Sequence, residues 1–176
     1  MLYIIFILAS AALIGLDQWV KAWTVVAFAA PLTVGGTTPD APVPFLPGVV
    51  ELTRVHNTGA GWSSFAGQRW FLVAVSVAIV AAVIYALVRR VVRHPLGLAA
   101  SFLIIAGGLG NVIDRVRLGY VVDMFHFEFW PSYPVFNVAD ICIVVGGVLA
   151  AGYYLFLYDK YDARKKNDGE ADPPTE

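Results

Sequence analysis

Three carboxylates stand next to apolar runs that are long enough to cross a bilayer. Asp114 and Asp123 follow the apolar run 96–113, and Asp140 comes just before the run 141–158. An ionisable side chain at membrane depth is energetically costly, and such residues mark functional sites by default. The three acids are therefore the first candidates for chemistry in this chain.

Asp123 and Asp140 suit a two-carboxylate mechanism. Adjacent packing of the last two apolar helices would bring them together, and two close acids in a partly dry site share one proton. One carboxylate then takes a proton from water while the other, protonated, polarises a scissile carbonyl. The competing interpretation is that these acids cap helix ends or pair with Arg115 and Arg117, and the spacing alone leaves both open.

A second polar group lies just before Asp123. Asn111, Asp114 and Arg115 have the i, i+3 and i+4 spacing that places side chains on one helix face, where they can form a polar network. The glycines of the segment 107–110 would let another helix approach closely. This segment is therefore expected at a helix–helix contact.

Two further candidates lie in the N-terminal third. Asp17 and Lys21 are i, i+4 neighbours, which favours a structural ion pair near the membrane boundary, with direct substrate contact as the alternative. The segment 57–61 joins the amide of Asn57 to small residues such as Gly59. It predicts a tight turn or, alternatively, an amide that clamps a peptide.

Other catalytic classes are disfavoured. His56 and His126 are too isolated for a metal site, and no zinc-binding motif occurs. Ser63 and Ser64 have no evident general base. The single cysteine, Cys142, excludes an internal disulfide and is expected to be a small buried residue. No metal or cofactor is expected.

Composition identifies an integral membrane protein, because 59% hydrophobic residues, 14% charged residues and a mean hydropathy of +0.70 are unlike a soluble domain. The fold class expected is an all-α polytopic membrane protein with four transmembrane helices and a small extracytoplasmic β-rich element. The predicted spans are about 3–28, 70–88, 96–113 and 141–158. A cleaved signal peptide is the alternative for the first segment, although it lacks a basic start.

Basic residues give the orientation. Three arginines lie between the second and third spans, and four basic residues follow the fourth: Arg89, Arg90, Arg93, Lys160, Arg164, Lys165 and Lys166. By the positive-inside rule both termini are cytoplasmic, and residues of about 29–69 and 114–140 lie outside. The net charge of −1 and the absence of other basic clusters exclude a nucleic-acid surface.

The outer segments have their own patterns. Residues 31–47 are rich in Pro, Gly and Thr and are expected to be irregular, whereas 48–55 alternates like a short strand. Aromatic clusters at 62–71 and 125–133 are typical of a membrane interface, and they could also line a lipid-accessible site. Residues 1–158 are predicted to form one membrane-embedded domain, and the charged tail 159–176 to be disordered.

Taken in order, five motifs resemble the lipoprotein signal peptidases, or signal peptidase II, over residues of about 15 to 150. They are Asp17-Gln18 with Lys21, Asn57-Thr58-Gly59-Ala60, Gly107-Gly108-Leu109-Gly110-Asn111 with Asp114-Arg115, Gly119-Tyr120-Val121-Val122-Asp123, and Phe136-Asn137-Val138-Ala139-Asp140. The sequence departs from the usual pattern at Gly61-Trp62, where Ala-Phe is common, and at Met124, where Phe is common. These departures bear on substrate contacts rather than on the chemistry.

The resemblance implies an aspartic endopeptidase of the bacterial plasma membrane that removes the signal peptide from prolipoproteins, cutting just before a cysteine that carries diacylglycerol. It implies inhibition by globomycin, a cyclic peptide, and a site open to membrane lipid. Asp123 and Asp140 become the catalytic dyad. The residues implied to bind substrate or to support the site are Asn57, Gly59, Asn111, Asp114, Arg115, Asn137, Asp17 and Lys21.

Two other function classes fit the composition. A small transporter could use Asp114, Asp123 and Asp140 as a proton relay, but the central thirds of the spans contain no acid. A scaffold without chemistry would use the glycines for packing and the acids as caps. The scaffold predicts that isosteric replacement of either aspartate leaves cellular function intact.

Overall fold

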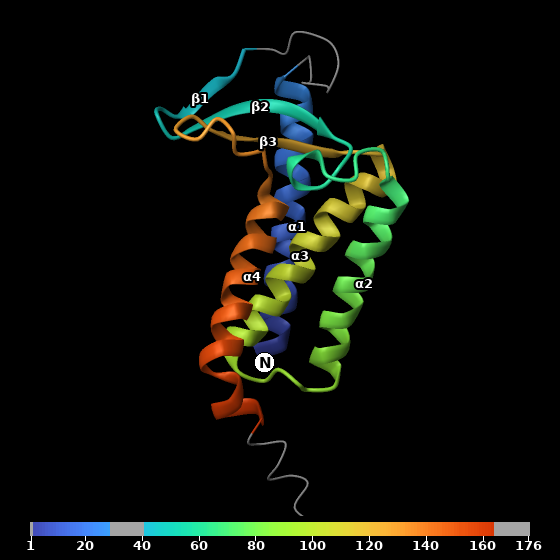
Figure 1. The fold of residues 1–176 in the computed structure, drawn as a ribbon, viewed down its shortest axis with the longest axis vertical. Coiled ribbons are helices and arrows are strands. Elements are labelled where there is room, and N and C mark those ends of the chain that lie inside the picture. Colours follow the sequence, from blue (N-terminus) through green and yellow to red (C-terminus); the bar gives the residue numbers. More distant parts are fainter. Residues whose placement is uncertain (1, 29–40, 164–176) are drawn as a thin grey trace, which may run out of the picture.

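Four long helices dominate the computed structural model, which describes residues 2–28 and 41–163. They are α1 (Leu2–Ala27), α2 (Arg69–Val88), α3 (Pro95–Leu118) and α4 (Val138–Phe156). Each is long and apolar enough to cross a membrane. The helices run side by side, with a small sheet across one end (Figure 1), which we call the sheet end. The predicted four-span fold class is confirmed.

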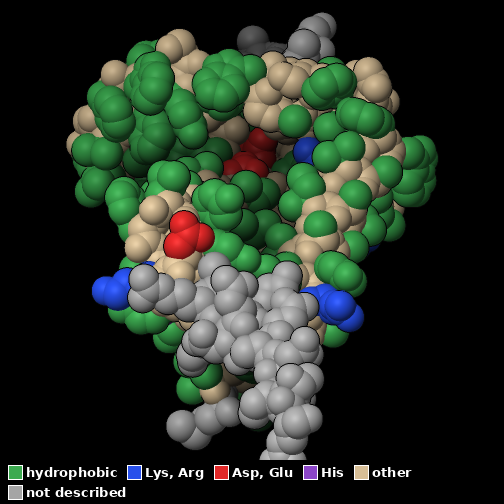
Figure 2. All heavy atoms as spheres, turned by 60° about the horizontal axis from the view of Figure 1, so that its bottom comes forward, with side chains coloured by type: hydrophobic (Ala, Val, Ile, Leu, Met, Phe, Trp, Pro, Cys, Tyr) green, Lys and Arg blue, Asp and Glu red, His purple; other side chains and the backbone are tan. Residues whose placement is uncertain are grey.

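The outward faces of the helices are apolar. Most side chains of α2 are exposed, including Val77, Ile79 and Ile84, and its buried residues are confined to Leu72, Val80 and Leu87 among those described. Hydrophobic side chains accordingly cover much of the visible surface in Figure 2. An apolar face of this extent is stable in hydrocarbon rather than in water.

Helix α3 lies at the centre and packs against α1, α2 and α4. Its glycines allow the close approach that the sequence predicted. A Cβ atom on Gly107 would lie 2.3 Å from the carbonyl oxygen of Ala139, and one on Gly110 would lie 2.8 Å from the carboxylate of Asp17. Glycine is required at these positions because the backbone of α4 and a side chain of α1 already occupy the space.

Gly107→Ala should therefore lower the free energy of unfolding by about 1–3 kcal/mol, the usual range for overpacking a tight contact. The added methyl group must push α3 away from α4, since its closest neighbour is backbone. Thermal unfolding in detergent measures the loss. Gly147→Ala on α4 is the matched control, because a Cβ there meets no atom within 4 Å. Equal destabilisation of both variants would contradict the steric explanation.

The sheet consists of β1 (Val43–Leu46), β2 (Val50–Asn57) and β3 (Val121–Phe127), antiparallel in the order β1-β2-β3. Leu52, Val122 and Met124 pack with Phe28, which follows α1, to form a small core under the sheet. This core ties the sheet to the bundle. The positions of β2 and β3 are therefore fixed relative to the helices.

Several predicted boundaries need correction. Helix α3 continues past the predicted end at 113 to Leu118, where Gly119 with φ of 90° ends it, so Asp114 and Arg115 lie inside the helix. The strand predicted at 48–55 is β2 at 50–57, and β1 lies in a segment predicted to be irregular. Helix α4 begins at Val138 rather than near 141.

The sequence did not reveal β3. Its first four residues, Val121 to Met124, are all buried, so the alternation of buried and exposed residues that marks a strand is missing. The predictions for 29–40 and 164–176 lie outside the described residues. At the start of the predicted tail, Asp159–Ala163 form a short helical turn. Cys142 is buried, as expected.

Candidate functional site

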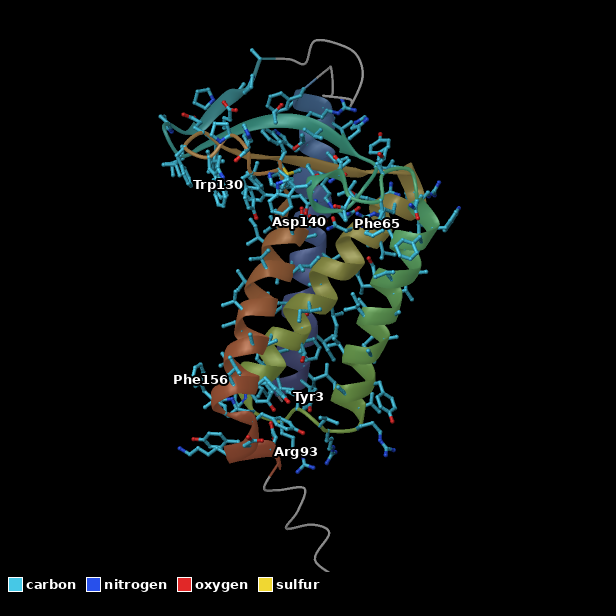
Figure 3. The ribbon with its side chains drawn as sticks, in the orientation of Figure 1. Tyr3, Phe65, Arg93, Trp130, Asp140 and Phe156 are labelled. Atoms are coloured by element: carbon cyan, nitrogen blue, oxygen red, sulfur yellow. The ribbon has the colours of Figure 1, made fainter. Side chains whose placement is uncertain are left out.

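Asp123 and Asp140 face one cavity of about 410 Å³ beneath the sheet. Asp123 comes from β3, and Asp140 lies in the first turn of α4, at the sheet end of the bundle (Figure 3). Acidic side chains are recessed in a hollow bordered by hydrophobic ones (Figure 2). The other polar residues lining the cavity include Asn57, Asn111 and Arg115.

A capping box fixes Asp140. Asn137, the N-cap of α4, accepts a hydrogen bond from the Asp140 backbone N–H at 2.9 Å, and Asp140 Oδ2 accepts one from the Asn137 backbone N–H at 3.2 Å. The capping interpretation of Asp140 is therefore correct. It does not remove Asp140 from chemistry, because the same carboxylate lines the cavity.

Strand pairing fixes Asp123. The residue lies opposite Val55 of β2, and its side chain is 1% exposed. Asn57, at the end of β2, donates to Asp123 Oδ2 at 3.0 Å, and Asn137 donates to Oδ1 at 2.6 Å. Among the described residues no arginine forms an ion pair with Asp123, so the predicted alternative of pairing with Arg115 or Arg117 is wrong.

Asn111 and Asn137 together link the two carboxylates. Asn111 Nδ2 donates to Asp140 Oδ1 at 2.8 Å, and Asn111 Oδ1 accepts from Asn137 Nδ2 at 3.1 Å. Each of the four carboxylate oxygens of Asp123 and Asp140 thus accepts one N–H bond. An oxygen of this type has a second lone pair, so each carboxylate can accept a further hydrogen bond or hold a proton.

Burial, followed by the charge of Asp140, raises the pKa of Asp123 to about 7, although the amides of Asn57 and Asn137 and the charge of Lys21 lower it. Near neutral pH Asp123 is therefore protonated in about half of the molecules. A carboxylic acid that keeps its proton at this pH can donate to a carbonyl oxygen.

The raised pKa predicts how stability depends on pH. The folded protein holds a proton that the unfolded chain, with an ordinary pKa of 3.8, has released. This contribution to folding is complete below about pH 4 and is lost as the pH rises through about 7. We expect the thermal unfolding midpoint in detergent to fall as the pH rises from about 4 to about 7 and to level off above that, and Asp123→Asn to flatten this slope. Asp159→Asn, at an exposed position, should leave it unchanged.

Behind the dyad, Lys21 joins two acids. Its Nζ lies 2.9 Å from Asp17 Oδ2 and 3.0 Å from Asp114 Oδ2, and all three side chains are at most 4% exposed. The predicted pair of Asp17 and Lys21 is confirmed, with Asp114 as an additional partner. Asp114 is thus directed towards Lys21 and away from the cavity, and its Oδ2 also accepts from the Val122 backbone N–H.

Arg115 makes a different contact from those of Asn111 and Asp114. Its Nη2 donates to the carbonyl of Gly59 at 2.7 Å, so it does not join the network of Asn111 and Asp114. Asn57 Oδ1 accepts from the Gly59 N–H at 2.9 Å, which supports the predicted turn. A Cβ on Gly59 would lie 2.6 Å from the Ser63 backbone, so glycine is needed there.

Sequence reasoning gave no role to Gln18, which occurs only within a motif. Gln18 donates to Asp114 Oδ1 at 2.9 Å and completes the network behind the dyad. Trp62 and Tyr133 line the cavity, with ring centroids 5.8 Å apart. Their aromatic clusters predicted a membrane interface or the lining of a lipid-accessible site. No cluster that could hold a metal occurs in the described part of the chain.

Comparison with known proteins identifies the family of this chain. A family model described as signal peptidase II matches residues 9–156. The chain is 40% identical over 169 residues to a lipoprotein signal peptidase of Enterococcus faecalis, covering 94% of this chain and 96% of the relative. It is 39% identical over 145 residues to one of Streptococcus pyogenes, covering 82% and 89%.

Two solved bacterial membrane enzymes share the fold. One superposes with a TM-score of 0.73 at 24% identity, covering 97% of this chain and 94% of that chain. The other gives 0.70 at 27% identity, covering 86% and 93%. The family model and the two relatives together cover nearly the whole bundle and the sheet. The chain belongs to the signal peptidase II family, the membrane proteases that remove signal peptides from prolipoproteins.

Proposed function

We propose that this protease works by an aspartic mechanism in which Asp123 and Asp140 are the catalytic dyad, and that it cuts immediately before the diacylglyceryl-modified cysteine. The observation that carries the proposal is the pair of carboxylates on one cavity, with all four oxygens held by N–H donors. Preorganised carboxylates of this kind are suited to general acid–base hydrolysis of a peptide. Family membership also favours hydrolysis over the relay and scaffold alternatives.

The dyad divides the chemistry in two. Asp123, whose pKa burial raises to about 7, in its protonated form gives its proton to the scissile carbonyl oxygen, while Asp140 takes a proton from a water molecule whose oxygen attacks the carbonyl carbon. The tetrahedral intermediate then collapses: the proton on Asp140 passes to the leaving nitrogen, the C–N bond breaks, and a hydroxyl of the intermediate returns its proton to Asp123 as the C=O bond re-forms. The dyad ends the cycle with one proton, as it began.

The lining of the cavity supports a lipid-anchored substrate. Besides its polar residues, the cavity is lined by Val75 of α2 and by Ile143 and Val144 of α4. These three side chains are also exposed on the outer faces of their helices. The cavity therefore opens sideways between α2 and α4, towards the position that the acyl chains occupy. A substrate held in the bilayer by diacylglycerol can reach the dyad by this path.

Arg115 and Asn57 are the groups that we assign to the peptide backbone. Both line the cavity next to the dyad, and Arg115 Nε has no hydrogen-bond partner although it is buried. An unpaired buried donor is costly, and an extended substrate strand offers carbonyl oxygens that would satisfy it. Globomycin, as a cyclic peptide, is expected to compete for these same donors.

The location follows from charge. Arg89 and Arg90 lie at the end of the bundle opposite the sheet, and Figure 3 shows Arg93 at that end. The positive-inside rule then places the sheet and the dyad on the extracytoplasmic side, with both termini in the cytoplasm of a bacterium.

Cysteine labelling tests this orientation. In a Cys142→Ala background, Ser132→Cys on the exposed loop after β3 should react with a membrane-impermeant maleimide in intact cells. Arg89→Cys, exposed at the opposite end, should react only after the membrane is permeabilised. The reverse pattern would place the dyad in the cytoplasm.

The function is tested with purified protein and one prolipoprotein prepared with and without the diacylglyceryl group. We expect cleavage of the modified form, with mass spectrometry placing the new N-terminus at the lipidated cysteine, and inhibition by globomycin. The unmodified form, which lacks the membrane anchor at the cut, should be cleaved poorly. Equal cleavage of both forms, or a cut at another bond, would contradict the proposed specificity.

A further inference from the structure

Lys21 contacts Asn111, which holds Asp140, as well as the two acids with which it forms ion pairs. In addition to Asp17 and Asp114, its Nζ donates to Oδ1 of Asn111 at 3.1 Å. An ammonium group has three donors and no acceptor. All three donors are therefore in use within a side chain that is 3% exposed. The third contact is the informative one, because Asn111 also touches Asp140.

The amide of Asn111 has two orientations, and only one is compatible with a catalytic dyad. As it stands, Oδ1 accepts from Lys21 and Asn137 while Nδ2 donates to Asp140. A flipped amide would direct its N–H groups at two donors and its oxygen at a carboxylate oxygen. Since an ammonium can only donate, the carbonyl must face Lys21 and the N–H must face Asp140.

The second carboxylate, Asp123, is connected to Asn111 through the amide of Asn137. Once Asn111 Oδ1 accepts from Asn137, the second N–H of the Asn137 amide remains for Asp123, where the N···O distance is 2.6 Å. Its carbonyl oxygen meanwhile accepts from the Asp140 backbone. The ammonium group on α1 thus sets the direction of the Asn111 amide, while the backbone N–H of Asp140 also fixes that of Asn137.

We propose that Lys21 is a positioning residue for the peptidase reaction: through Asn111 it sets the direction of the hydrogen bond that holds Asp140, and it supports the Asn137 amide that holds Asp123. The inference rests on the proposed aspartic function. It goes beyond an ion pair, in which Lys21 would do no more than neutralise Asp17 and Asp114.

Two variants separate positioning from neutralisation. Lys21→Met removes the donor but leaves Asp17 and Asp114 as buried acids, so it can fail to fold. The triple variant Asp17→Asn/Lys21→Met/Asp114→Asn also removes those charges, and buried ionic groups replaced together are tolerated far better than one removed alone. We expect the triple variant to regain much of the lost stability and yet to have a kcat about 10–100-fold below wild type, the usual effect of losing an orienting partner.

A double-mutant cycle on kcat gives the second readout. In an Asn111→Leu background there is no amide to orient, so Lys21→Met should lower kcat by less than about twofold further. A third readout is the pH profile. The charged groups that face Asp123 are Asp140, Lys21 and Arg115, and without Lys21 the alkaline limb should move to higher pH.

The outcomes are distinct. A triple variant with wild-type stability and wild-type kcat would overturn the positioning role, as would a full effect of Lys21→Met in the Asn111→Leu background. Failure of the aspartic function itself looks different, because Asp123→Asn would then retain activity. A stable triple variant with low kcat, together with the coupling to Asn111, supports the inference.

Discussion

Asp123→Asn and Asp140→Asn are each expected to lower kcat by about 10³-fold or more, since both steps of acid–base transfer require a proton that an amide cannot exchange. The substitution is isosteric, so the cavity keeps its shape. For Asp140 the capping contact is largely preserved, because the amide oxygen can still accept from the Asn137 N–H. The loss should therefore appear in kcat and not in folding.

The measurement is cleavage of the modified prolipoprotein at equal concentrations of folded enzyme, with folding checked by thermal unfolding. Asp159→Asn, exposed on the turn after α4, is the matched control and should retain wild-type kcat. A folded variant with more than about a tenth of wild-type activity would remove that aspartate from the dyad. Full activity in both variants would favour the alternative in which the two acids only cap helices and take no part in chemistry.

Lys21→Met is expected to lower the free energy of unfolding by about 3–5 kcal/mol, the range found when one partner of a buried ionic group is removed. Lys21 lies within 3.0 Å of both Asp17 and Asp114. Without the ammonium, two acids remain buried beside each other, and the Asn111 carbonyl loses a donor. Methionine keeps most of the apolar length of lysine, so lost packing contributes little.

Denaturant or thermal unfolding in detergent measures this loss, with Lys160→Met as the control, because Lys160 is exposed beyond α4. A loss below about 1 kcal/mol, the value typical of a surface ion pair, would mean that Lys21 is solvated and not a buried partner.

The spans and the class of the protein followed from local properties. Four runs of the right length and hydropathy predict four helices regardless of how they pack, because the bilayer selects each helix on its own. The sequence also predicted the pair of Asp17 and Lys21 and the close helix contact at the glycines of 107–110, since a helix fixes which residues share a face. The motifs then pointed to the family that the comparisons confirm.

The contacts between the residues of the site were harder to predict from the sequence. Asp114 is as acidic as Asp123 and closer to the apolar run, yet it lies against Lys21. Arg115, next to it in sequence, reaches Gly59 instead of an acid. The partner of each side chain depends on how α1 and the 58–67 loop pack against α3, and no sequence pattern predicts that packing.

The sequence by itself determined that this is a four-span membrane protein with acids near its membrane boundaries, because hydropathy, length and residue type act locally. Only the tertiary structure decided how Asp123 and Asp140 are brought to one cavity. The register of β3 on β2, the start of α4 at Asn137, and the amides of Asn111 and Asn137 place them there, with Lys21 of α1 behind Asn111. These contacts join residues distant in sequence, and their geometry exists only once helices and sheet have packed together.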